Sequence, residues 1–451
     1  MTRFDELRAR IQADIFAGLP AHFSRLGWSA DRLHSWQRDR LRALLACALE
    51  RSAFHARRLA GIDLERFELA DLRCLPVMTK SELMAGFDEV STDPRLNREA
   101  AESALTATGS EPRPLPGGNL CMATGGSSGH RGIFCYDPAG VTEFASLIFR
   151  TRLAALGADP ARIPEISFAM VGAPSAVHGT MFIPSVLAGS PIKFAFVPVT
   201  WPLAEIVGRL NRLQPQGLFG YPSMLARLAI EQDAGRLAIA PRVVNSTAET
   251  LLPHFRAAIT RAFGAPIVNT FATSEGLVGA SAPDDPVITM ATDSCVVELV
   301  DDAYRPVPPG IASTRVLVTN LYNRLQPLIR YELPDSFTRQ PDSASHGHLR
   351  VTVVGRSDEI LHYTQADVHP VVLRSVLLAQ AGVVDYLVTQ TPRGVAVLVL
   401  LGQDTDLAGL GESLRTALLR AGLPDPEVQV EAVSSLPRHP QTGKLRRVIP
   451  A

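Results

Sequence analysis

The sequence predicts an α/β fold in which a large N-terminal domain has a largely parallel sheet covered by helices, followed by a small C-terminal α+β domain. From about residue 120 to 330, strand-like apolar runs alternate with segments of helical spacing. Such alternation is typical of helices packed on parallel strands. The chain has 451 residues. Since one hydrophobic core stops growing at roughly 250–300 residues, we expect more than one domain.

The first 90 residues are predicted to form a helical lead-in. Apolar residues recur at helical spacing from Phe4 to Ile15 and again from Trp36 to Leu59. Thr79 or Ser81 is suited to cap a further helix. Residues 91–118 are rich in Ser, Thr, Pro and Gly, which predicts a surface connection.

The alternating region and the tail supply the remaining predicted elements. Strands are expected at Ile166–Val171, Ile192–Val199, Gly217–Gly220, Val243–Ser246 and Ile267–Phe271, and helices at Val141–Leu156, Ala204–Leu213, Ser223–Gln232 and His254–Phe263. In the tail we expect helices at Pro370–Gln380 and Leu407–Ala421, and strands at Val384–Thr389, Val395–Leu401 and Glu427–Val433. These elements predict a core domain over 1–356 and a C-terminal domain over 357–451.

Composition and charge exclude several classes of protein. Charged residues make up 20% of the chain and the formal net charge is −1, so a general nucleic-acid or membrane-surface role has no support. The charged start, from Met1 to Leu19, lacks the apolar core of a secretory signal. The five cysteines form no C-x-x-C pair. We therefore expect reduced thiols in a cytoplasmic protein.

The most suggestive motif is the Gly- and Ser-rich segment from Thr124 to Gly132. Its small residues leave backbone N–H groups able to surround an anion, and Arg131 adds positive charge. A plain flexible turn is an equal alternative. The Gly-x-Ser-x-Gly pattern also fits a hydrolase with Ser127 as nucleophile, but that motif needs a helix directly after the turn. Gly132–Pro138 looks like a second strand, which favours a hairpin around a phosphate.

Three further motifs have modest weight alone. Glu275 ends a strand-like run, where a carboxylate could hold Mg²⁺ against phosphate oxygens, and Phe271 nearby could stack on a purine. Asp335 could accept hydrogen bonds from both ribose hydroxyls. Lys444 follows Thr-Gly near the chain end. A helix-capping Ser-Glu pair, a strand ending at Pro-Asp and a solvated basic tail are the alternatives, and they stay open.

Together these motifs, in this order and spacing, resemble the adenylate-forming superfamily of acyl-CoA synthetases, adenylation domains and luciferases. The segments Thr247–Glu275 and Pro437–Lys444 are the most specific, and the phenylacetate–CoA ligase-like branch is the most similar. The resemblance implies that the protein uses ATP to convert a carboxylic acid into acyl-AMP, with release of pyrophosphate. The acyl group then passes to an acceptor, which is CoA, a carrier-protein thiol or an amine.

The resemblance also implies a role for each matching residue. The ATP-binding residues are Thr124, Gly125, Gly126, Ser127, Ser128, Gly129, Thr247, Ala248, Glu249, Asn269, Phe271, Ala272, Ser274 and Asp335. Lys444, Arg131 and Arg356 are catalytic, Glu275 binds Mg²⁺, and Asp358 is the hinge of a mobile C-terminal domain. The acyl pocket comprises Phe168, His178, Tyr221 and Ser246, which suit a flat aromatic acid.

The sequence departs from the family pattern at three places, of which the third concerns the acceptor. Arg131 replaces a lysine, and Phe271-Ala272 replaces Tyr-Gly. Gln365 stands where the family has the glycine that the pantetheine arm approaches, so transfer to CoA is predicted to be poor. Two other functions stay open at this point, a serine hydrolase using Ser127 and a nucleotide-binding protein that has lost catalysis.

Overall fold

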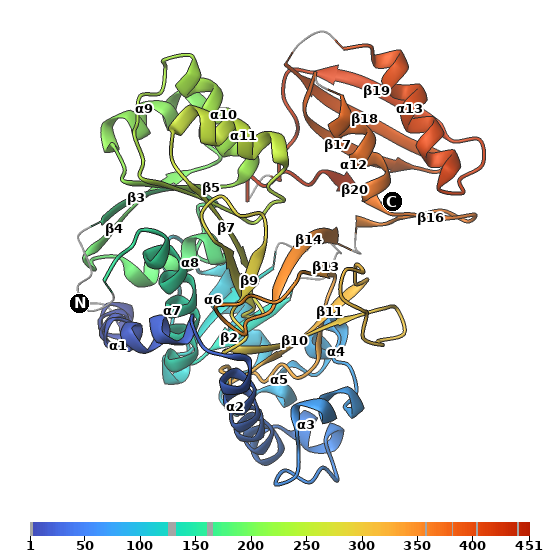
Figure 1. Cartoon of the computed structure of the whole chain (residues 1–451). Helices are drawn as coiled ribbons and strands as arrows, with labels where there is room; N and C mark the ends of the chain where they lie inside the picture. Colours follow the sequence, from blue (N-terminus) through green and yellow to red (C-terminus); the bar gives the residue numbers. More distant parts are fainter. Residues whose placement is uncertain are drawn as a thin grey trace.

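A large mixed sheet forms the centre of the protein. The computed structural model (Figure 1) describes residues 3–124, 132–159, 166–356, 359–380, 382–402, 405–439 and 442–451. The strand order in the sheet is β13-β14-β9-β8-β7-β6-β5-β3-β4. These strands are β3 (Ile166–Gly172), β4 (Ile192–Pro198), β5 (Gly217–Gly220), β6 (Val243–Thr247), β7 (Ile267–Ala272), β8 (Val278–Ser281), β9 (Ile288–Met290), β13 (Asp335–Arg339) and β14 (Arg350–Arg356).

The half of this sheet formed by β4, β3, β5, β6 and β7 is parallel, and β8, β9, β14 and β13 extend it in antiparallel fashion. Successive residues of a strand face opposite sides, so each side of the sheet has its own core. Phe168, Val243 and Val268 face one side, which is covered by α7 (Pro138–Ala155) and α8 (Gly179–Leu187). The other side is covered by α9 (Leu203–Leu213), α10 (Pro222–Asp233) and α11 (Pro253–Phe263). The predicted α/β class is confirmed.

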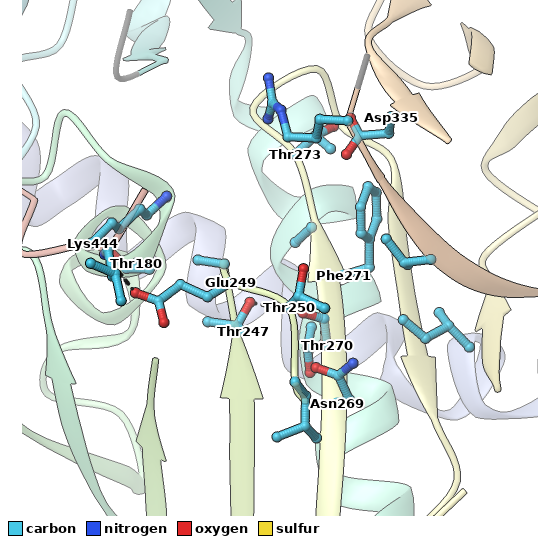
Figure 2. Close-up of a pocket in the computed structure, with 18 of the residues that line it drawn as sticks. Thr180, Thr247, Glu249, Thr250, Asn269, Thr270, Phe271, Thr273, Asp335 and Lys444 are labelled. Carbon is cyan, nitrogen blue, oxygen red and sulfur yellow. Dashed lines mark hydrogen bonds between the residues drawn. The ribbon is translucent and has the colours of Figure 1, made fainter. Parts of the chain in front are cut away.

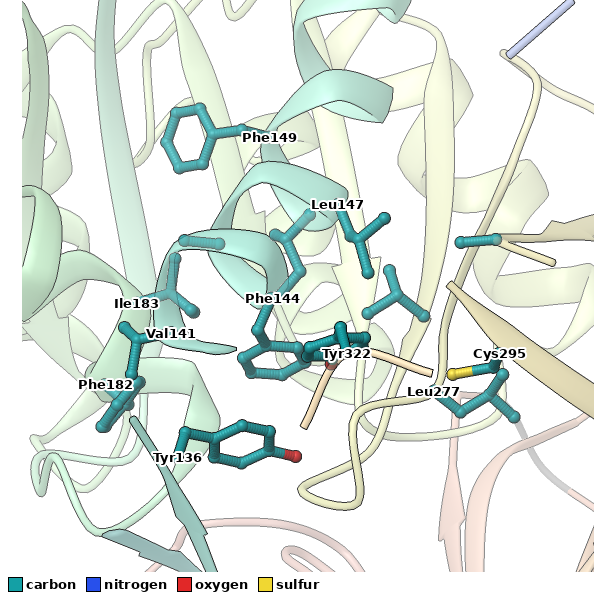
Figure 3. Close-up of a cluster of buried hydrophobic side chains, with 14 of the residues drawn as sticks. Tyr136, Val141, Phe144, Leu147, Phe149, Phe182, Ile183, Leu277, Cys295 and Tyr322 are labelled. Atoms are coloured by element: carbon teal, nitrogen blue, oxygen red, sulfur yellow. The ribbon is translucent and has the colours of Figure 1, made fainter. Parts of the chain in front are cut away.

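Aromatic stacking holds α7 against Tyr136 and Tyr322. The ring of Tyr136 stacks on Phe144 of α7, with centroids 5.8 Å apart, and on Tyr322, at 6.2 Å. Figure 3 shows these rings together with Ile183 and Phe182 of α8 in one apolar cluster. A smaller sheet lies beside them, with the order β10 (Cys295–Val300), β11 (Arg315–Asn320) and β12 (Tyr331–Leu333).

The N-terminal region is helical, as predicted. It contains α1 (Arg3–Arg25), α2 (Ala30–Arg51), α3 (Ala53–Arg58), the 3-10 helix η1 (Leu69–Cys74), α4 (Lys80–Ala85) and α5 (Phe87–Val90). Thr79 caps α4 and forms a capping box with Glu82. The surface connection predicted for 91–118 was wrong in part, because that stretch holds α6 (Arg98–Thr106) and the short 3-10 helix η2 (Pro116–Gly118). Asn97 caps α6, whose Ala101 and Leu105 are buried.

The strands that flank the glycine-rich segment form an antiparallel hairpin. They are β1 (Leu120–Ala123) and β2 (Ile133–Tyr136), and their register places Cys121 directly opposite Cys135. The two cysteines form a disulfide. The expectation that all the thiols are reduced was therefore wrong. The two residues are 14 positions apart in the sequence, and only the pairing of the hairpin makes them neighbours.

The C-terminal segment folds around its own apolar cluster, which includes Leu373, Tyr386, Val397 and Leu414. Its elements are β15 (Leu361–His362), β16 (Asp367–Val368), α12 (Pro370–Ala379), β17 (Val383–Thr391), β18 (Gly394–Leu401), α13 (Leu407–Arg420), β19 (Glu427–Val433) and β20 (Val448–Ile449). The sheet order is β19-β18-β17-β20, and Figure 1 shows this unit beside α11. The division at 356/357 stays a prediction.

Among the helices that the structure describes, none is both long and apolar enough to cross a membrane.

Candidate active site

A cavity of about 1360 Å³ lies at the carboxyl ends of the parallel strands, between the large sheet and the C-terminal segment. Ligands in α/β proteins bind at this edge of the sheet. Figure 2 shows Lys444 and Glu249 on one side of the cavity and Phe271 and Asp335 on the other. Pockets for a single small ligand usually measure about 300–1000 Å³. The cavity therefore has room for a nucleotide together with a second substrate.

The turn after β6 carries the motif Thr247-Ala248-Glu249, and all three residues line the cavity. Ala248 has φ of +66°, a conformation that is costly for a residue with a Cβ and often occurs at functional sites. The Thr247 hydroxyl donates to the Thr270 carbonyl at 2.8 Å, which ties the turn to β7.

The Glu249 carboxylate is engaged by protein groups. It accepts the backbone N–H of Leu445 at 2.9 Å and that of Ser223 at 3.2 Å. Arg438 and Arg447 lie 3.9 and 4.0 Å from its two oxygens. Glu249 therefore joins α10 of the core to the C-terminal segment. The sequence placed it among the nucleotide-binding residues and gave no sign of this linking contact.

The turn Ser274-Glu275-Gly276 is held by three hydrogen bonds to its backbone carbonyls. Tyr136 donates to Ser274 at 2.7 Å, the Asn320 amide to Glu275 at 3.0 Å, and Tyr322 to Gly276 at 2.9 Å. Gly276 has φ of +97°, and a Cβ there would lie 2.3 Å from the Asn320 amide nitrogen. Only glycine fits, so the position of Glu275 is rigidly fixed.

The Glu275 carboxylate is buried at the cavity wall. Burial raises its pKa, Asp335 adds to the increase, and Lys80 and Arg356 oppose it. No group of three or more potential metal ligands occurs within the part of the chain that the structure describes. Mg²⁺ at nucleotide sites is usually held by one or two carboxylates and substrate phosphates. Glu275, completed by phosphate oxygens, fits that arrangement. The sequence offered no signal for Lys80 beyond its place at a helix start.

Asp335 and Arg356 are brought together by strand pairing. They are direct partners in the antiparallel ladder of β13 and β14, and both line the cavity. Phe271 also lines it, with its ring edge-to-face against Phe337 at 5.1 Å. Thr124, Asn269, Ala272 and Ser274 complete this predicted nucleotide half. The sequence-predicted residues thus share one cavity, and their individual roles stay predictions.

Lys444 lies in a tight turn of the C-terminal segment. Its ammonium nitrogen is 5.9 Å from the centre of the Tyr221 ring. The turn is closed by a hydrogen bond from the Gly443 N–H to the His439 carbonyl at 2.8 Å, and one from the His439 N–H to the Lys444 carbonyl at 3.0 Å. Burial lowers the pKa of Lys444, and the nearby Glu249 carboxylate opposes that effect.

Several predicted residues lie outside the described part of the chain: Gly125, Gly126, Ser127, Ser128, Gly129, Arg131 and the hinge residue Asp358. The structure does describe Thr124 and Gly132, the residues at the two ends of this loop. The Thr124 N–H donates to the Gly132 carbonyl, and the Gly132 N–H donates to the Thr124 hydroxyl, each at 3.0 Å. The chain then enters β2 and not a helix. The strand-to-helix step of a hydrolase elbow is absent at Gly132.

The predicted acyl-pocket residues divide into two groups. His178 lines the cavity, and Tyr221 faces Lys444 with its hydroxyl accepting the Ala173 N–H at 3.2 Å. Phe168 and Ser246 were misplaced by the sequence: Phe168 stacks on Phe194 in the core, and the Ser246 hydroxyl donates to the Asn269 side chain at 2.8 Å. The apolar lining includes Phe219 and Met170, which the sequence placed in or beside the acyl pocket. It also includes Phe144, Ile148 and Ile183, which the sequence did not single out.

We compared the sequence and the fold with those of known proteins. No protein-family model matches the chain. The sequence is 24% identical to phenylacetate-coenzyme A ligase of Thermus thermophilus over 79% of this chain and 77% of that protein. It is 26% identical to the protein CapK of Staphylococcus aureus over 35% of each chain. A solved structure of 2-hydroxyisobutyryl-CoA ligase, in the postadenylation state with R3-HIB-AMP, superposes with a TM-score of 0.70 and 17% identity, covering 94% of this chain and 91% of that one.

The chain has the fold of the adenylate-forming ligases. Its resemblance to the phenylacetate–CoA ligase-like branch, stated from sequence motifs, is thereby confirmed. The neighbours also include an amide bond synthetase of Marinactinospora thermotolerans, with a TM-score of 0.53 and 18% identity over 73% of this chain and 68% of that one. The same 2-hydroxyisobutyryl-CoA ligase in its thioesterification state gives a TM-score of 0.57.

Proposed function

We propose that the protein activates a carboxylic acid with ATP and Mg²⁺, forming acyl-AMP and pyrophosphate, and then transfers the acyl group to CoA. The observation that carries this proposal is the convergence of Lys444, Glu275 and the Asp335–Arg356 pair on one cavity. In this reading Asp335 accepts the ribose hydroxyls and Phe271 lies against the adenine. The acyl group occupies the apolar part of the cavity, beside Phe219.

The reaction joins two anions, since a carboxylate attacks the α-phosphorus and pyrophosphate leaves. Catalysis then rests on positioning and on neutralising charge, without a protein nucleophile. Lys444 and Arg356 supply positive charge where the negative charge develops. Mg²⁺ held by Glu275 would neutralise the phosphate oxygens. Burial lowers the pKa of Lys444, and a bound phosphate would act in the opposite direction by favouring the ammonium form.

The proposal that CoA is the acceptor rests on the names of similar proteins. Phenylacetate-coenzyme A ligase and 2-hydroxyisobutyryl-CoA ligase are named for CoA, whereas the amide bond synthetase shows that the fold also serves amide formation. Gln365 is exposed between β15 and β16. The suggested obstruction of CoA by Gln365, a carrier-protein acceptor and a cytoplasmic location stay predictions.

The decisive experiment is a screen of carboxylic acids for pyrophosphate release, with and without CoA, followed by mass analysis of products. We expect AMP and pyrophosphate in equal amounts, with thioester when CoA is present. ADP and phosphate as products would overturn the proposal. A Ser127→Ala variant separates the hydrolase alternative, since only a hydrolase needs that hydroxyl as its nucleophile.

A further inference from the structure

Arg152 places a guanidinium group deep in the acyl part of the cavity. It lies on α7 two turns after Phe144 and one turn after Ile148, and all three residues line the cavity. Its guanidinium carbon is 4.4 Å from the centre of the Phe219 ring on β5. Only 6% of Arg152 is exposed to solvent. A charged group in this position is unusual in a pocket with mainly apolar walls.

Arg152 has no protein anion to neutralise it among the residues that the structure describes. Its Nε is buried without a hydrogen-bond partner, and burial lowers its pKa to about 9. Arg150, on the same helix, differs sharply. Its guanidinium donates two hydrogen bonds of 2.6 Å to the Asp293 carboxylate. The Nε of Arg150 also lacks a partner, but the Asp293 carboxylate neutralises the charge of Arg150, whereas Arg152 lines the cavity without such an anion among the described residues.

A second buried polar group lies on the same face of the sheet. Asn245 of β6 is the register partner of Phe219, and both atoms of its side-chain amide are buried without a partner. Burying a cation or an amide without partners costs free energy, which a bound ligand can return by supplying the missing acceptors. Asn245 does not line the cavity, so the inference that the deep end of the pocket receives a negatively charged group rests on Arg152, which does.

We propose that the acid substrate is a dianion, whose second carboxylate pairs with Arg152 while the first is activated beside Lys444. This inference rests on the proposed function. Lys444 faces Tyr221, and Arg152 lies over Phe219, two residues earlier on the same segment. Lys444 and Arg152 both line the cavity. A dicarboxylic acid with an aromatic ring or a short chain between its carboxylates would offer one anion to each, and a ring would also lie against the apolar lining.

The test compares matched pairs of acids in the pyrophosphate-release assay: benzoate with benzene-1,4-dicarboxylate and with benzene-1,3-dicarboxylate, and butanoate with butanedioate. The natural protein should prefer a dianion. In Arg152→Met, kcat/KM for that dianion should fall about 10- to 100-fold, since hydrogen bonds between charged groups contribute about 1.5–3 kcal/mol. Activity toward the matched monoacid should hold or rise. Arg212→Met, an exposed arginine at the end of α9, is the control and should change neither value.

Folding and binding are measured apart from turnover. Without ligand, Arg152→Met should unfold at the same temperature as the natural protein or higher, because it removes an unpaired buried charge. Calorimetry should detect the dianion binding to the natural protein and more weakly to Arg152→Met. Binding of the dianion without pyrophosphate release would refute the proposed function and leave only the pairing of the dianion with Arg152 standing. Two results together would overturn this inference and leave the proposed function intact. The natural protein would adenylate monoacids better than dianions, and Arg152→Met would unfold at a lower temperature or show the same kcat/KM for the dianion.

Discussion

Substituting Gly443 by alanine tests whether the C-terminal segment must dock on the core for adenylation. Gly443 precedes Lys444 and has φ of +64°. A Cβ at this position would lie 2.2 Å from the Cγ1 atom of Val199, which follows β4 in the core. The substitution therefore pushes the lysine turn away from the core without touching any charged group of the cavity.

The size of the effect follows from the contact. Ordinary van der Waals separation begins at 3.4 Å, so the two atoms must part by 3.4 − 2.2 = 1.2 Å. The positive φ adds roughly 1–2 kcal/mol for a residue with a Cβ. A misplacement of about 1 Å can slow an enzyme reaction by roughly 10²-fold. We expect a loss of this order in the rate of acyl-AMP formation, with little change in ATP binding.

The assay is single-turnover formation of acyl-AMP by Gly443→Ala, Val199→Ala and the double variant. Val199→Ala removes both γ-carbons and leaves Cβ at 3.4 Å, so the double variant should recover most of the rate. A double-mutant cycle then gives a coupling energy for the pair. An unimpaired Gly443→Ala, or a double variant as slow as Gly443→Ala, would refute docking of this turn against Val199 during adenylation.

Three other predictions concern the lysine, the acceptor and pH. Lys444→Ala should slow adenylation by roughly 10²–10³-fold while ATP still binds in calorimetry; an unchanged rate would exclude the assigned role. Gln365→Gly should speed thioester formation with CoA and leave acyl-AMP formation unchanged. Equal rates of thioester formation in the variant and the natural protein would show that Gln365 does not obstruct CoA. Burial lowers the pKa of both His22 and His55 to about 4. Because unfolding returns each to about 6.5, stability is full above pH 6.5 and falls toward pH 4, by up to about 3 kcal/mol for each group. In urea unfolding, His55→Gln should reduce this pH dependence, and the remainder should persist because the pKa values of His254, His346, His348 and His369 are also lowered; an unaltered slope would contradict the assignment.

The sequence was informative where a residue's position in an element determines what it can do. The strands and helices from Ile166 to Phe263 were predicted within a few residues, because their apolar periodicity directly reflects the two faces of the sheet. Asp335 and Arg356 were both predicted to belong to the site. Strand pairing then explains why two residues so far apart in sequence lie together.

The residues that the sequence missed depend on contacts between distant elements. Arg152 is one of many arginines, and only the packing of α7 on β5 shows that it is buried and lacks a carboxylate partner. The disulfide between Cys121 and Cys135 depends on the register of a hairpin. Helix α6 was missed because polar and small residues outnumber its buried Ala101 and Leu105.

The contacts that hold the C-terminal segment on the core bear on the prediction that this segment moves about a hinge at Asp358 after adenylation. In addition to Glu249, they include the Arg438 guanidinium donating to the Ser223 hydroxyl at 3.0 Å and a hydrogen bond of 2.9 Å between the His254 ring and the Val384 carbonyl. Each such bond contributes about 0.5–1.5 kcal/mol net, more where a charge takes part. Their sum is comparable to the 5.5 kcal/mol or so that shifts a two-state equilibrium from one form to the other. We expect bound ATP to stabilise the docked form through the charge of its phosphates, and the departure of pyrophosphate removes most of that charge while the α-phosphate stays. We therefore predict that adenylation weakens docking of the segment without any protein group being broken or modified.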